Sequence, residues 1–151
     1  MEPLTQIVSK SAEETELFGA KIATTMTTDA TLPPFIALFG DLGVGKTAFV
    51  RGFTSVIAPG VAVRSPTFAL VNEYRAKPRS VFHFDMYRIA DEDDLFSIGF
   101  YDYLDRAGIC LVEWSENISY ALPDRYIRID IDKTNADAPN ERTITVRMIG
   151  E

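Results

Sequence analysis

Apolar and polar residues recur along the chain with two different periods, which predict helices interspersed with strands. Ser11 followed by Glu14 has the spacing of a capping box, and apolar residues at helical intervals behind it predict a helix over residues 12–26. A second helical pattern covers residues 47–57. The acidic run 91–94 predicts the start of a third helix, because negative charge is favoured at the positive end of the helix dipole.

Strands are predicted by short apolar runs and by strict alternation of apolar and polar residues. Runs without polar residues are typical of strands buried on both faces, whereas alternating runs are typical of strands with one exposed face. These patterns predict buried strands over residues 35–39 and 109–112, and half-exposed antiparallel strands over 127–131 and 144–148. They also predict an antiparallel hairpin formed by 68–74 and 80–84, whose basic tip, 75–79, faces solvent.

The order of these elements predicts the fold class. Helices lie between buried strands in the first part of the chain and half-exposed strands end it, a pattern typical of an α/β domain. We expect a central mixed, mainly parallel sheet flanked by helices, with antiparallel strands at its edges. The length of 151 residues is typical of one domain, so we expect residues 1–151 to form a single unit.

Charge and cysteine content narrow the classes of function. The formal charge of −7 argues against a free-standing nucleic-acid-binding protein, because affinity for phosphate backbones needs clustered Lys and Arg. A single cysteine forms no internal disulfide, which favours a reducing compartment, and Cys110 is expected in the core because it lies in an apolar run. No secretion signal or membrane-spanning run is recognised, so we expect a cytoplasmic protein without membrane contact.

Residues 40–47 match the phosphate-binding motif G-x-x-x-x-G-K-[ST] between a buried strand and a helical pattern, as the motif requires. Glycines let successive backbone N–H groups turn towards an anion, and the following helix presents its positive end to the same phosphates. We expect Lys46 to reach the β- and γ-phosphates and the Thr47 hydroxyl to bind Mg²⁺. The fold is therefore expected to be a three-layer P-loop NTPase-like domain. Its predicted nucleotide-binding residues are Asp41, Leu42, Gly43, Val44, Gly45, Lys46, Thr47 and Ala48.

A P-loop enzyme also needs an acidic residue at the end of a neighbouring strand. Asp85 and Glu113 both follow largely apolar strands, and the local sequence leaves open which one contacts the metal directly. We expect both to serve with Thr47 in metal binding, and Glu113 also to orient the attacking water. Thr67, in a Ser-Pro-Thr turn, is expected to sense the γ-phosphate, although a simple turn before a strand explains it equally well. The predicted catalytic residues are Lys46, Thr67, Asp85 and Glu113.

Other features carry weaker predictions. The single histidine, His83, makes no metal site by itself and is expected to be a hydrogen-bonded structural residue. Arg88 is expected to form a surface ion pair, although its charge also suits a phosphoryl transition state. No N-K-x-D guanine-reading motif is found, which favours ATP over GTP. No Arg-rich lid insertion is recognised either, which disfavours a small-molecule kinase.

Four sequence blocks stand out together, at residues 40–52, 65–74, 83–88 and 113–116. Their content and order resemble those of the bacterial TsaE (YjeE) family of small P-loop ATPases, which are required for threonylcarbamoyladenosine (t6A) formation in tRNA. The resemblance implies ATP or ADP and Mg²⁺ as cofactors and the TsaB and TsaD proteins as partners. It also implies Walker A roles for Gly45, Lys46 and Thr47, a switch role for Thr67, a Mg²⁺-linked role for Asp85, a second acidic role for Glu113, and a place near the nucleotide for Trp114.

We therefore expect an ATPase that turns over slowly without partners and drives or resets threonylcarbamoyl transfer by TsaB and TsaD. Contact with tRNA is expected to be indirect, because an acidic chain is unsuited to holding a polyanion. Self-association is left open. Two alternatives of other kinds remain, a kinase for a small acceptor and a nucleotide-sensing binding module with negligible turnover.

Overall fold

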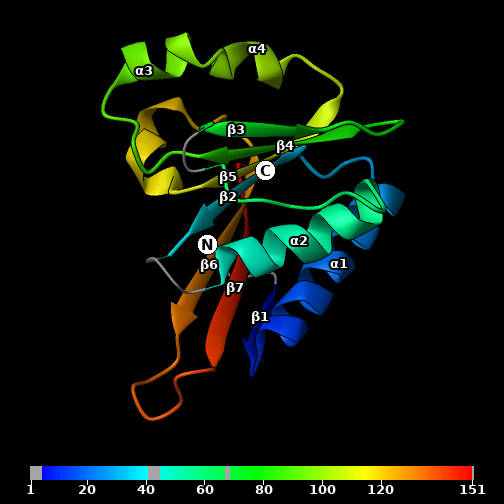
Figure 1. Ribbon diagram of the computed structural model, residues 1–151, viewed down its shortest axis with the longest axis vertical. Coiled ribbons are helices and arrows are strands. Elements are labelled where there is room, and N and C mark those ends of the chain that lie inside the picture. The colour runs from blue at the N-terminus through cyan, green and yellow to red at the C-terminus, as the bar shows by residue number, and fades with distance from the viewer. Residues whose placement is uncertain (1–4, 41–44, 67–68, 151) are drawn as a thin grey trace.

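The computed structural model describes residues 5–40, 45–66 and 69–150, and these form a twisted sheet with helices on both faces (Figure 1). The strands lie in the order β1-β7-β6-β2-β5-β4-β3. Their bounds are Thr5–Ser9 (β1), Phe35–Phe39 (β2), Val71–Tyr74 (β3), Ser80–Asp85 (β4), Gly108–Glu113 (β5), Tyr126–Lys133 (β6) and Arg142–Ile149 (β7). The helices are Ala12–Thr28 (α1), Lys46–Ile57 (α2), Glu92–Ser97 (α3), Phe100–Leu104 (α4) and the 3₁₀ helix Ser115–Ala121 (η1).

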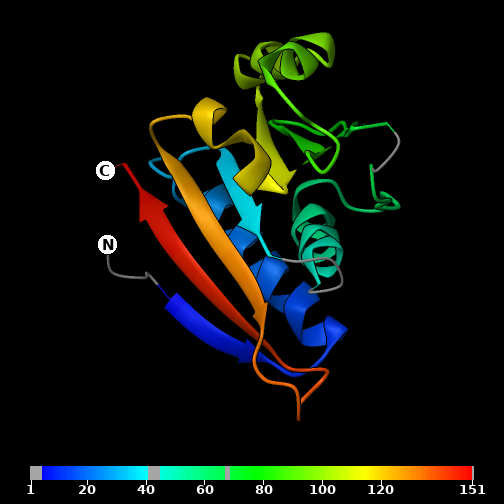
Figure 2. The same ribbon diagram turned by 90° about the vertical axis from the view of Figure 1, so that its left-hand side faces the viewer.

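The centre of the sheet is parallel and both edges are antiparallel. Strands β6, β2, β5 and β4 run parallel to one another. Strands β7 and β1 extend one edge, where they lie side by side in Figure 2, and β3 extends the other. The predicted mixed sheet is confirmed. Because β2, β5 and β4 are adjacent and parallel, their carboxyl ends meet at the same end of the sheet.

Alternate strand positions supply two apolar cores, one on each face of the sheet. On one face, Ile36 and Leu111 pack with Phe49 of α2 beneath the α1–α2 pair. On the other face, Val112 packs with Phe100 of α4. Strands β2 and β5 are buried on both sides, as their uninterrupted apolar sequences predicted.

Helices α1 and α2 cross in backbone contact at two glycines. A Cβ atom added to Gly52 would lie 1.8 Å from the Glu16 carbonyl oxygen, and one added to Gly19 would lie 2.3 Å from the Phe49 carbonyl oxygen. A hydrogen is therefore the only substituent that fits at either position. These contacts set the separation of the two helices and hence the placement of α2 over the sheet.

Some elements differ from the sequence prediction. The single helix expected after residue 91 is two short helices, α3 and α4, because Gly99 between them has a φ of 73°. Strand β3 begins at Val71, later than predicted, because Leu70 turns the chain with a φ of 69°. Strand β1 and helix η1 have no counterpart in the prediction.

The basic tip of the β3–β4 hairpin is only partly exposed. Arg75 and Lys77 are exposed as expected. The guanidinium of Arg79 instead donates to the Met26 carbonyl oxygen of α1 at 3.1 Å. The prediction that the whole tip faces solvent is therefore wrong for Arg79, which ties the hairpin to α1.

Cys110 lies buried in β5, where burial raises the pKa of its thiol to about 12. The thiol is therefore protonated at neutral pH, which confirms the expectation of a core residue. In the described part of the chain, no helix combines the length and apolarity needed to cross a bilayer.

We expect Gly52→Ala to lower the free energy of unfolding by about 1–3 kcal/mol or more, because the added methyl forces apart two packed helices. Denaturant unfolding measures the change. Arg51→Ala is the matched control, since Arg51 is exposed and its 3.4 Å ion pair with Glu16 is a surface pair worth at most about 1 kcal/mol. Equal stability of the Gly52 variant and the wild type would contradict the backbone contact.

Candidate active site

The amino end of α2 lies against the carboxyl end of β2. Gly40 directly follows β2, and Gly45 caps α2 with a φ of 102°, a conformation that L side chains rarely adopt. The second invariant glycine of the motif is thus required by backbone geometry at position 45. The first turn of α2 leaves backbone N–H groups without helical partners, which is the property that binds phosphates.

Lys46 is the first residue of α2, and its side chain is buried, with 4% of the residue exposed. Its Nζ donates to the Gly40 carbonyl oxygen at 2.6 Å and lies 4.0 Å from the ring centroid of Trp114. Such partners stabilise a buried cation, which would otherwise be costly to remove from water. The ammonium therefore lies between the end of β2 and the residue that follows β5.

Asp85 and Glu113 are the last residues of neighbouring parallel strands and pair directly in register. Both are 6% exposed. Strand alternation places both side chains on the α2 face of the sheet, because Val81 and Ile109, an even number of residues earlier, belong to the core on that face. Two carboxylates thus end adjacent strands beside the start of α2.

Local hydrogen bonds orient Asp85. Its Oδ1 accepts from the Tyr87 backbone N–H at 2.9 Å, as in an Asx turn, and its own N–H donates to the Leu70 carbonyl oxygen at 3.0 Å. The Glu113 carbonyl oxygen accepts from Met86 at 3.0 Å, so the two strand ends stay paired beyond the carboxylates.

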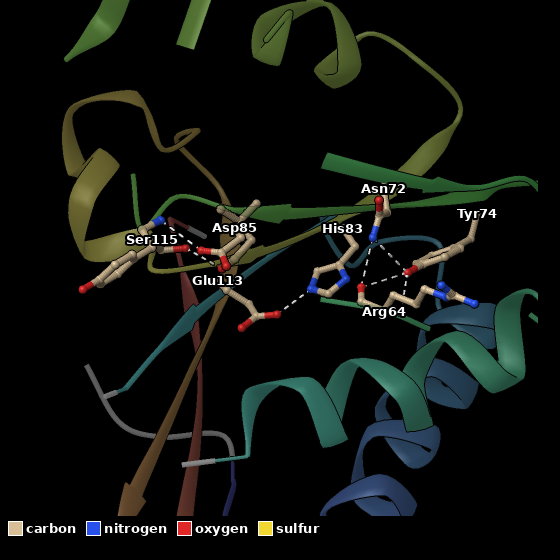
Figure 3. Close-up of polar contacts among 9 residues, drawn as sticks. Arg64, Asn72, Tyr74, His83, Asp85, Glu113 and Ser115 are labelled. Atoms are coloured by element: carbon tan, nitrogen blue, oxygen red, sulfur yellow. Dashed lines mark hydrogen bonds and ion pairs between the residues drawn. The ribbon is translucent and has the colours of Figure 1, made fainter. Parts of the chain in front are cut away.

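His83 contacts Glu113 directly (Figure 3). The distance between His83 Nε2 and Glu113 Oε2 is 2.5 Å, and the His83 residue has no exposed surface. His83 Nδ1 has no hydrogen-bond partner within the described ranges. The expectation of a hydrogen-bonded histidine is confirmed, but its partner is a carboxylate of the candidate site.

Trp114 is turned over Lys46 by an unusual backbone conformation. Its φ of 58° is left-handed, and its ring lies 5.0 Å from that of Tyr87. Ser115, the next residue, donates from its hydroxyl to the Val112 carbonyl oxygen at 2.8 Å. Backbone strain of this kind in a residue other than glycine often accompanies functional sites.

Two side chains of β3 anchor the segment that precedes Ser65 and Pro66 (Figure 3). The Tyr74 hydroxyl accepts from the Arg64 N–H at 3.0 Å and donates to the Arg64 carbonyl oxygen at 3.2 Å. Asn72 Nδ2 donates to the same carbonyl at 3.0 Å. The hairpin that carries His83 and Asp85 therefore also fixes the start of this segment.

A hollow of about 410 Å³ adjoins Gly45. Its walls come from the residues before α1, the first turn of α1, the end of the β6–β7 connection and the first residue of β7: Lys10, Ser11, Ala12, Glu13, Thr15, Asn140 and Arg142. Apart from Ser11 of the capping box, sequence reasoning did not single out these residues, because only the fold brings the start of α1 and the start of β7 together.

The described candidates come together at one place. Gly45, Lys46, Thr47 and Ala48 begin α2, and Trp114 brings Lys46 next to the strand ends that carry the two acids. Ala48 is buried in the protein, so its backbone N–H is the part suited to a phosphate. Arg88 is exposed. The remaining candidates lie outside the described residues and stay predictions: Asp41, Leu42, Gly43, Val44 and Thr67.

The donor set suits Mg²⁺ held together with a nucleotide. Within residues 5–40, 45–66 and 69–150, no three His, Cys, Asp or Glu side chains are grouped so as to bind a metal alone. Mg²⁺, however, is usually held by one or two carboxylates together with waters and substrate phosphates. Asp85, Glu113 and the Thr47 hydroxyl have this chemistry, so the residues fit the ion.

Comparison with known proteins identifies the family. The family model described as "Threonylcarbamoyl adenosine biosynthesis protein TsaE" matches residues 9–144. The chain belongs to the TsaE family. Two relatives named tRNA threonylcarbamoyladenosine biosynthesis protein TsaE illustrate the similarity. The Haemophilus influenzae protein is 40% identical over 77% of this chain and 73% of its own length. The Treponema pallidum protein is 31% identical over 91% of this chain and 97% of its own length.

A solved structure has the same fold. The crystal structure of YdiB from Bacillus subtilis aligns with a TM-score of 0.73 and 29% identity, over 97% of this chain and 86% of that one. The α/β fold expected from the sequence and the resemblance to the TsaE family are both confirmed.

Proposed function

We propose that this TsaE-family chain binds and hydrolyses ATP with Mg²⁺ and thereby drives or resets threonylcarbamoyl transfer to tRNA by TsaB and TsaD. The observation that carries the proposal is the burial of Lys46, at the start of the P-loop helix, against Trp114, which follows Glu113 at the end of β5, where Asp85 ends the neighbouring strand β4. One point charge for phosphates and two acids for metal and water are the parts that phosphoryl transfer requires.

The phosphates of ATP would be bound by the charge of Lys46 and by backbone N–H groups. Phosphates would meet the N–H groups of the first turn of α2 and exchange places with the Gly40 carbonyl as partners of the Lys46 ammonium. The hollow beside Gly45 has room for the nucleoside end, and Asn140 and Ser11 offer polar groups to it. Thr67 stays a predicted γ-phosphate sensor on sequence alone.

Asp85 and Glu113 have different roles in the proposed reaction. The Thr47 hydroxyl and Asp85 would hold Mg²⁺, which when bound neutralises charge on the phosphate oxygens. Glu113 would hydrogen-bond the attacking water and accept its proton as the new P–O bond forms and the bond to the ADP oxygen breaks. Positioning and charge stabilisation supply most of the catalysis in such sites, so a chain without partner-supplied groups is expected to turn over slowly.

Family membership and net charge support a proposal about which subunits contact tRNA. The relatives are named for tRNA threonylcarbamoyladenosine biosynthesis, and this chain carries a formal charge of −7. A strongly acidic subunit is unsuited to hold tRNA itself, so we propose that TsaB and TsaD contact the tRNA and that the complex works in the cytoplasm.

Lys46→Ala is expected to weaken ATP binding by about 10–100-fold, because it removes a charge-assisted contact worth about 1.5–3 kcal/mol. Calorimetry with Mg²⁺ and ATP measures the affinity, and circular dichroism is expected to show a folded chain. Lys21→Ala, on the exposed face of α1, is the control. Lys46→Ala should also fail to restore t6A in cells lacking the protein. Full restoration by Lys46→Ala together with unchanged ATP affinity would overturn the proposed function.

Glu113→Gln is expected to keep ATP affinity within about threefold while losing at least about 100-fold in hydrolysis, since it removes the proton acceptor but keeps the shape of the side chain. Phosphate release in the presence of TsaB and TsaD provides the rate. Glu116→Gln, an exposed acid in η1, serves as the control. A wild-type rate of ATP hydrolysis by the Glu113→Gln variant would show that another group orients the water. Transfer of labelled γ-phosphate to a metabolite would instead indicate a kinase.

A further inference from the structure

We propose that His83 is a positioning residue for ATP hydrolysis, which fixes the Glu113 carboxylate through its Nε2–H. The 2.5 Å contact between His83 and Glu113 carries the inference, which rests on the proposed role of Glu113. In Figure 3 one carboxylate oxygen points to the imidazole and the other points away from it.

The burial of His83 calls for an explanation by function. His83 has no exposed surface, and strand alternation places its side chain on the α2 face of the sheet, to which the buried apolar residues Val81 and Leu111 contribute. Placing a polar ring in such surroundings costs free energy unless it is hydrogen-bonded. Glu113 supplies that bond, and in return receives a donor at a carboxylate that is 6% exposed.

The direction of the hydrogen bond follows from the chemistry of the pair. The proposed role of Glu113 as proton acceptor requires an ionised carboxylate, which only accepts hydrogen bonds, so we assign the shared proton to His83 Nε2. In the described part of the chain, His83 is the one group that hydrogen-bonds to the Glu113 carboxylate. His83 Nδ1, in turn, has no partner among the described residues. The contact supports an orienting role of the imidazole towards the carboxylate.

Packing holds the imidazole in place. His83 pairs with Asn72 of β3 and Leu111 of β5 across the sheet. The ring of Tyr74 lies 6.5 Å from that of His83 at 34°, and the Tyr74 hydroxyl is itself fixed to the Arg64 backbone. The donor is thus presented by a rigid sheet and needs no rearrangement when the water is activated, which is how preorganised groups assist catalysis.

Three substitutions of His83 distinguish a role in orienting Glu113 from a role in packing alone. The amide nitrogen of glutamine reaches about as far as His Nε2, whereas that of asparagine reaches only as far as Nδ1. We therefore expect His83→Gln to keep hydrolysis within about threefold of the wild type. His83→Asn and His83→Phe are expected to lower kcat by about tenfold or more with KM for ATP within about threefold, since they affect the water and not nucleotide binding. Melting temperatures identify any variant that fails to fold.

The double variant His83→Phe with Glu113→Gln tests the route of the effect. If His83 acts through Glu113, the double variant hydrolyses ATP no more slowly than Glu113→Gln alone in single-turnover assays. A further tenfold loss, or wild-type kcat in both the Asn and Phe variants, would overturn the proposal. Wild-type hydrolysis by Glu113→Gln alone would instead overturn the proposed role of Glu113.

The contact is also visible without any turnover. His83 is the only histidine in the chain, so its ring ¹⁵N and ¹H resonances need no further assignment. We expect Nε2 to carry a slowly exchanging proton whose resonance moves in Glu113→Gln. A ring protonated only at Nδ1, or resonances unchanged in the Glu113 variant, would contradict the proposal whatever the ATPase activity.

Discussion

The site depends on keeping ionisable groups buried where α2 meets the strand ends. Lys46, Asp85, His83 and Glu113 are each at most 6% exposed, and none of them is stable there without a polar partner. Their partners in the described part of the chain include the Gly40 carbonyl, the Trp114 ring, a backbone N–H, and the His83–Glu113 contact. Low exposure strengthens charge interactions, so the arrangement that is costly for folding suits the phosphate binding that we propose.

The rest of the fold supplies the rigidity that this burial requires. Parallel pairing of β4 with β5 brings Asp85 and Glu113 together, and the glycine contact between α1 and α2 sets the position of the helix that carries Lys46. Separate apolar cores on the two faces hold the sheet on both sides. Strand ends and a helix start are thereby fixed relative to one another, as preorganised charge stabilisation demands.

Local patterns predicted the parts of the structure that depend on local sequence. The strand 35–39 matches β2, and the phosphate motif correctly marks the start of α2. The two acids could be chosen because buried strands run directly into them. Strand β1 was missed because its five residues are stabilised by β7, more than a hundred positions away. The break at Gly99 was missed because a helical apolar pattern continues through it.

The partner of His83 could not be read from sequence for a similar reason. The bond to Glu113 depends on the register of β4 against β5, which places position 83 beside Leu111 and position 85 beside Glu113. The hollow beside Gly45 likewise combines the start of α1 with residues before and within β7. Sequence reasoning therefore selected the candidate residues but not the non-local contacts that orient them.

Fluorescence of Trp114 tests the central claim, that ATP binds where Lys46 meets the ends of β4 and β5. Trp114 is the only tryptophan in the chain, and its ring lies 4.0 Å from the Lys46 ammonium. Titration with ATP and Mg²⁺ is predicted to change its emission saturably in the wild type, and to have little effect in Lys46→Met at the same concentrations. Binding of ATP in equilibrium dialysis with no change in Trp114 emission, or equal binding by both proteins, would contradict the account.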